Sequence, residues 1–129
     1  MGSKSDYLEN EILDHVLGQG AYSAPTPYLG LYTAAPTDAG GGTEVSGGSY
    51  ARVAISAKFG AASGGSSANT ASIDFPTATA SWGTVVAFGI FDASTAGNLL
   101  YWGALDTNKS VGDGDTPSFG TGTLTITED

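Results

Sequence analysis

The chain has 129 residues, a length typical of a single domain. Gly, Ala, Ser and Thr make up more than half of the residues and only 13% are charged, which excludes a coiled coil or a charge-rich helical bundle. The formal net charge of −9 gives a surface that repels phosphate groups, so neither nucleic acid nor a membrane is expected as a partner.

The reactive side chains are few. The chain has no cysteine and one histidine, His15, which excludes disulfides, thiolate metal sites and sites that need two imidazoles. The first residues lack the pattern of a signal peptide, and no stretch reaches the ~20 apolar residues of a membrane span. We therefore expect a soluble protein made in the cytoplasm, without a metal or a cofactor.

The segment from Asp6 to Leu17 has the apolar spacing of an amphipathic helix. Asp6 followed by Glu9 has the form of a capping box, with Ser5 as an alternative cap, and Gly18 is placed to end the helix. We predict an N-terminal anchoring segment over residues 1–18 that binds a partner through its apolar stripe, formed by Leu8, Ile12, Leu13, Val16 and Leu17.

After Pro25 and Pro27 the pattern changes to short runs rich in β-branched and aromatic residues, separated by clusters of Gly, Ser, Asn and Asp. These runs predict six strands, at Tyr28–Thr33, Ser49–Lys58, Ala71–Phe75, Thr84–Phe91, Leu99–Leu105 and Ser118–Thr127.

The last of these runs shows the alternation of a half-buried strand, because Leu124 and Ile126 alternate with threonines. With six short strands and no second helix, the sequence predicts a mainly β fold in which residues 19–129 form one antiparallel β-sandwich, jelly-roll-like or immunoglobulin-like, with a small barrel as the alternative.

Two connections are rich in small residues, from Thr37 to Gly48 and from Gly60 to Thr70. Their composition is typical of mobile surface loops. The alternative is that they are extended arms that become ordered on a neighbouring subunit.

No group of residues predicts catalysis. Asp113 and Asp115 resemble part of a calcium loop, but the glutamate of such a loop is missing, so we interpret them as a hairpin turn. His15 has no identifiable nucleophile or orienting acid, and the carboxylates nearest the predicted strands, Asp74, Asp92 and Asp106, are better placed to end strands. We expect a protein that is not an enzyme.

The aromatic residues have two interpretations. They could form a platform for sugar rings, but most lie inside predicted strands, where packing in the core or at a subunit interface is expected. Arg52 lies on the same strand face as Tyr50, and we expect it to pair with an acid. We include Tyr28, Tyr50 and Arg52 with the helix stripe as candidate partner-binding residues.

Three segments, Ser5–Gly18, Tyr28–Ile55 and Phe75–Leu105, resemble short virion-associated proteins of tailed bacteriophages, which are often labelled tail-fibre-like. The resemblance implies a virion structural protein with a β-sandwich core, and it does not imply a catalytic or receptor residue.

Within that class we predict a capsid decoration protein, or cement protein, that binds the outside of the major capsid lattice as a homotrimer. Its partners would be the major capsid protein and copies of itself. The alternative is a tail-fibre or adsorption component that binds a host surface glycan, with the helix joining it to the tail. A fibre that reaches a receptor is usually long, and 129 residues without a fibrous repeat favour the head.

Overall fold

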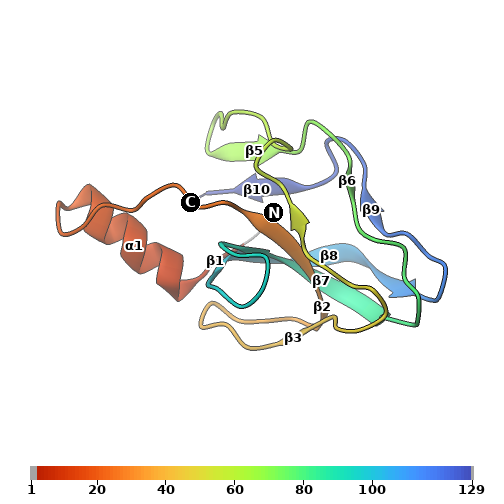
Figure 1. The fold of residues 1–129 in the computed structure, drawn as a ribbon. Coiled ribbons are helices and arrows are strands. Elements are labelled where there is room, and N and C mark those ends of the chain that lie inside the picture. The colour runs from red at the N-terminus through yellow and green to blue at the C-terminus, as the bar shows by residue number, and fades with distance from the viewer. Residues whose placement is uncertain (1–2, 129) are drawn as a thin grey trace.

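The computed structural model describes residues 3–128 and contains one helix and ten strands in that range (Figure 1). It confirms a mainly β fold with antiparallel sheets and a single N-terminal helix. The helix is α1 (Asp6–Val16), and the strands are β1 (Ser3–Lys4), β2 (Tyr28–Ala34), β3 (Thr43–Glu44), β4 (Val53–Ala54), β5 (Ser66–Ala68), β6 (Ile73–Asp74), β7 (Gly83–Phe91), β8 (Leu99–Val111), β9 (Ser118–Phe119) and β10 (Thr125–Thr127).

The largest sheet has six strands in the order β1-β8-β7-β2-β3, and β4 also pairs with β2. Strands β2, β7 and the first half of β8 are rich in aliphatic and aromatic residues that are mostly buried or partly buried, whereas residues 106–110 of β8 are polar and exposed. Gly30 of β2 lies directly opposite Gly89 of β7, and Leu31 lies opposite Phe88. The side chains of each such pair are on the same face of the sheet.

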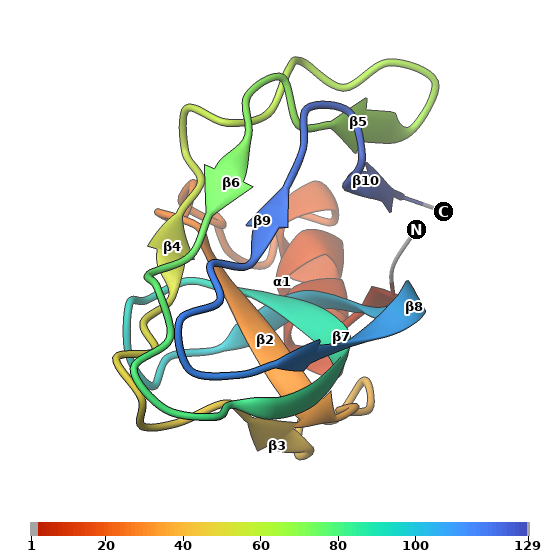
Figure 2. The same ribbon diagram turned by 90° about the vertical axis from the view of Figure 1, so that its right-hand side faces the viewer.

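A second layer covers one face of this sheet (Figure 2). It consists of two separate two-stranded sheets, β5–β10 and β6–β9, in place of one continuous sheet. The main core lies between the layers, where Leu29 and Ile90 of the large sheet belong to the same cluster as Ile73, Phe75 and Leu124.

Two predicted strands are shorter or broken in the structure. In the predicted strand Ser49–Lys58 only Val53–Ala54 is extended, because Ser49 adopts a φ of 65° and the backbone N–H of Lys58 bonds back to Ile55 in a turn. The predicted strand Ser118–Thr127 divides into β9 and β10, because the N–H of Thr123 bonds to the carbonyl of Gly120.

Three regions contain more strand than predicted. Strand β8 continues past Leu105 to Val111. The two connections predicted as loops contain β3 and β5, which pair with β2 and β10. Both connections are therefore folded partly against their own chain.

The helix begins after Ser5, the residue predicted as the alternative cap. Ser5 is the N-cap, and its hydroxyl accepts a hydrogen bond from the N–H of Leu8. No helix within residues 3–128 is long and apolar enough to cross a membrane.

Candidate interaction site

The predicted apolar stripe of α1 divides into a buried half and an exposed half. Leu8 is 4% exposed and lies in the main core, and Ile12 packs against that core. Leu13, Val16 and Leu17 are 56%, 71% and 67% exposed, and they are the exposed large apolar residues of the described chain. The two halves therefore have different roles, the first holding the helix and the second available for contact.

The first turn of α1 is bonded to the sheet. The N–H of Ser5 donates to the carbonyl of Leu100 in β8, and the N–H of Asp6 donates to the carbonyl of Asp38. The indole N–H of Trp102 donates to the carboxylate of Asp38 at 2.9 Å, which fixes that loop to β8. From this attachment the helix extends away from the β layers (Figure 1). Its exposed apolar end is thus the end remote from the sheet.

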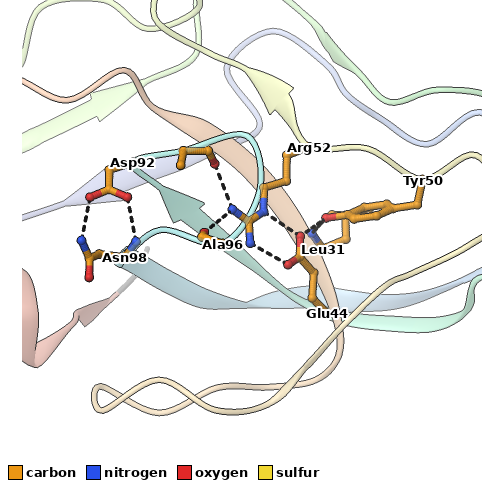
Figure 3. A network of polar contacts seen from close by, with 8 residues as sticks. Leu31, Glu44, Tyr50, Arg52, Asp92, Ala96 and Asn98 are labelled. Atoms are coloured by element: carbon orange, nitrogen blue, oxygen red, sulfur yellow. Dashed lines mark hydrogen bonds and ion pairs between the residues drawn. The ribbon is translucent and has the colours of Figure 1, made fainter.

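The side chain of Arg52 lies in a closed network (Figure 3). Its Nε and Nη2 atoms donate to the two carboxylate oxygens of Glu44 at 2.9 and 2.8 Å, and Nη1 donates to the carbonyls of Ala93 and Ala96. Its side chain is 8% exposed, and its guanidinium carbon lies 3.5 Å from the centroid of the Phe91 ring. The prediction that Arg52 pairs with an acid is confirmed.

Tyr50 belongs to the same network. Its hydroxyl donates to Glu44 Oε2 at 2.6 Å and accepts from the N–H of Leu31 at 3.0 Å. Its ring contacts Trp82 edge-on at a centroid distance of 5.3 Å and stacks on Phe75 at 6.3 Å. Burial, and then the bond to Glu44, raises the pKa of Tyr50 well above its ordinary value. The tyrosine is neutral at physiological pH.

These contacts show that Tyr50 and Arg52 support the fold, since they join β2, β3 and the loop after β7. Tyr28 is half-buried at the start of β2, opposite Phe91. A role for these three residues in partner binding stays a prediction, as it does for the helix stripe.

A groove that the sequence did not predict opens between β8 and the C-terminal segment. Its volume is about 780 Å³, and its lining includes Leu105, Asp106, Thr107, Lys109 and Phe119. The part of β8 beyond Leu105, where the predicted strand ends, forms one side of the groove. Nearby, the Asp115 carboxylate accepts from the N–H of Gly112 at 2.8 Å, as expected of a turn. Residues 3–128 contain no group of three or more acidic, His or Cys residues that could hold a metal ion.

Comparison of the sequence with known protein families defines the class of protein. The chain belongs to a family of phage fibre structural proteins, which are not enzymes. That family is described as podophage GP4 fiber I protein gp80, and its model matches residues 3–127. The comparison with curated proteins gave no match.

The family confirms the predicted resemblance to virion proteins of tailed phages. It also supports the predicted alternative, a fibre component of the virion, better than the capsid decoration protein. A chain of 129 residues is compatible with a fibre, because a short chain can be one part of a larger fibre.

Proposed function

We propose that this fibre protein is an adsorption component, joined to the rest of the tail by the exposed end of α1 and carrying a site for a host surface glycan on its β layers. The observation that supports attachment through α1 is the division of the apolar stripe into a buried and an exposed half. Leu8 is 4% exposed, whereas Val16 and Leu17 are 71% and 67% exposed.

The three exposed residues are spaced for one contact. Leu13, Val16 and Leu17 stand three and four positions apart, so their side chains share one face of the helix. Covering an aliphatic side chain completely contributes roughly 1.5–3 kcal/mol. Three such side chains supply enough free energy to hold a partner, even after part of it is offset by the loss of freedom on binding.

The charge around this end indicates the chemistry of the partner. Asp14 lies within the same turns, Glu9 and Glu11 precede it, and the whole chain carries a net charge of −9. A second copy would bring the same negative charge to the contact, so we favour a different virion protein that offers an apolar pocket bordered by lysine or arginine. The homotrimer predicted from the sequence stays a prediction.

Incorporation into particles tests the attachment. Phage carrying the triple substitution Leu13→Ser, Val16→Ser and Leu17→Ser should lose this protein from purified virions, because the apolar contact is removed. The change lies in exposed positions, so circular dichroism of the isolated variant should be unchanged. The substitution Asn10→Ser, on the same helix and exposed, is the control. Normal incorporation of the triple variant would refute attachment through α1.

Copy number tests the location independently. Quantitative mass spectrometry of wild-type virions should find few copies per particle, in proportion to the known tail proteins. Copies in proportion to the major capsid protein would refute the tail location and restore the capsid decoration hypothesis.

A further inference from the structure

The groove beside β8 has the size and position of a ligand site. Its volume of about 780 Å³ lies within the roughly 300–1,000 Å³ of small-molecule sites. It lies on the core side of the large sheet, and its lining comes from β8 and from the segment with β9 and β10, which lies above β8 in Figure 2. Its lining combines buried side chains of the large sheet, such as Leu31 and Phe88, with the exposed side chains of Thr107 and Lys109.

An irregularity in β8 forms one wall of the groove. Ala87 of β7 pairs with Ala104, and Val85 pairs with Lys109. The segment from Val85 to Ala87 in β7 therefore lies opposite the longer segment from Ala104 to Lys109 in β8. The additional residues of β8 make a bulge that carries Asp106 and Thr107. Bulges redirect side chains and occur often beside functional sites.

The polar side chains of the groove are of two kinds. Some are used within the chain, since Ser118 donates to Asp74 and the hydroxyl of Thr123 donates to the carbonyl of Gly120. Others have no hydrogen-bond or ion-pair partner within residues 3–128, and these are Asp106, Thr107 and Lys109. The groove therefore presents an acceptor, a hydroxyl and a donor that are not used by the fold.

Apolar surface lies beside these polar groups. Leu105 and Phe119 are partly buried and pack against the main core. Sugar rings combine an apolar C–H face with hydroxyl groups that both donate and accept hydrogen bonds, so a surface of this mixed kind suits them. The carboxylates of Asp106 and Asp115 outnumber the single ammonium of Lys109, and the net charge of −9 opposes an anionic ligand.

From this combination we infer that the groove between β8 and the C-terminal segment binds a neutral glycan, with Thr107 and Lys109 as hydrogen-bonding residues. The inference deepens the proposed function and rests on it, because that proposal places a glycan site on the β layers. It differs from the attachment through α1 in residues and in partner.

Binding by the isolated full chain tests the groove. Saturation-transfer NMR would be recorded with neutral oligosaccharides of glucose, galactose and N-acetylglucosamine, and with sialylated oligosaccharides. Lys109→Gln and Thr107→Val should each weaken binding of a neutral oligosaccharide about two- to tenfold, as expected for the loss of one hydrogen bond. Thr107→Trp should abolish it by filling the groove.

The chain offers matched controls. Lys58→Gln removes the same charge, and Thr95→Val removes the same hydroxyl; neither residue lines the groove, and both variants should bind as the wild type does. Since Thr107 and Lys109 are exposed, their variants should fold normally, which circular dichroism checks.

Three results of the binding experiment would overturn the inference, and a fourth comes from hydrogen exchange. They are the absence of binding to every neutral oligosaccharide in the panel, a preference for the sialylated ones, and binding that Thr107→Trp leaves unchanged. Protection of the groove from hydrogen exchange by another virion protein, and not by sugars, would equally overturn it by making the groove a protein contact. None of these results affects the incorporation test of α1, so failure of the groove and failure of the attachment are distinguishable.

Discussion

The guanidinium of Arg52 lies over the ring of Phe91, with its central carbon 3.5 Å from the ring centroid, and its nitrogens donate to Glu44 and to two carbonyls of the loop after β7. The ring of Phe91 stacks in turn with Tyr32 at 6.1 Å. A cation, a carboxylate and two aromatic rings thus close the face of the large sheet that the second layer does not cover.

Arg52 should be one of the most sensitive positions for stability. Arg52→Ala leaves the partly buried Glu44 carboxylate without its cationic partner, with only the Tyr50 hydroxyl still bonded to it, and we expect a loss of about 2–4 kcal/mol in the free energy of unfolding. Arg52→Lys keeps the charge but loses the paired hydrogen bonds, so it should recover less than half of that loss. Urea unfolding measures both, with Lys58→Ala as the control. A loss in Arg52→Ala no larger than in the control would contradict this role.

The glycine pair Gly30 and Gly89 should not tolerate a side chain. A Cβ at Gly30 would lie 2.8 Å from Glu44 Oε2 and 2.9 Å from the Tyr50 hydroxyl, and one at Gly89 would lie 2.8 Å from the Tyr32 ring. We expect Gly30→Ala and Gly89→Ala each to reduce the free energy of unfolding by about 1–3 kcal/mol, because these contacts must shift.

Gly20→Ala is the matched control for the glycine pair, since nothing lies within 4 Å of a Cβ there. Thermal unfolding followed by circular dichroism compares the three variants. An unchanged melting temperature in Gly30→Ala would show that Glu44 and Tyr50 can shift to accommodate the methyl group without loss of stability.

Ser5 joins the helix to the sheet through its side chain as well as its backbone. Its hydroxyl accepts from the N–H of Leu8 and donates to the carbonyl of Leu99, and the residue is 2% exposed. Ser5→Ala should cost about 1–2 kcal/mol of stability through loss of the cap, with faster hydrogen exchange in the first turn of α1. Ser23→Ala, in the exposed segment after the helix, is the control. Equal exchange rates in both variants would argue against the cap.

The protein should lose stability in alkali. Burial raises the pKa of Tyr32 to about 12, and burial with the bond to Glu128 raises the pKa of Tyr101 above its ordinary value. In the unfolded chain tyrosines ionise near pH 10, so above about pH 10 the unfolded state binds fewer protons than the folded state and the free energy of unfolding falls.

Urea unfolding between about pH 9 and about pH 12 should show this fall, and Tyr32→Phe should make it shallower because one of the shifted groups is removed. A free energy of unfolding that stays constant across this interval would contradict the raised pKa values.

The parts of the fold that follow from local pattern could be predicted. The helix α1 and strand β7 have regular apolar patterns, and in the structure most of these apolar residues of β7 are buried. The sequence also predicted that Arg52 pairs with an acid, but it could not identify Glu44, because which acid lies beside Arg52 depends on how the segment between the two residues folds.

The groove could not be predicted for a related reason. After Leu105 the chain continues with Asp106, Thr107, Asn108, Lys109 and Ser110, which are mostly residues that disfavour strands, so the pattern ends the strand there. The structure extends β8 because β7 pairs again with Lys109 and Ser110. Pairing with a distant strand outweighs local propensity, and the groove depends on that extension.

The bonds between the first turn of α1 and β8 leave no free linker between the helix and the sheet. A tail protein that held the remote end of α1 would therefore also set the direction in which β8 faces. The orientation of the subunit toward a bacterial surface would then depend on its attachment point. The backbone hydrogen bond from Ser5 to Leu100 and the neighbouring bonds would pass that orientation from the helix to the sheet.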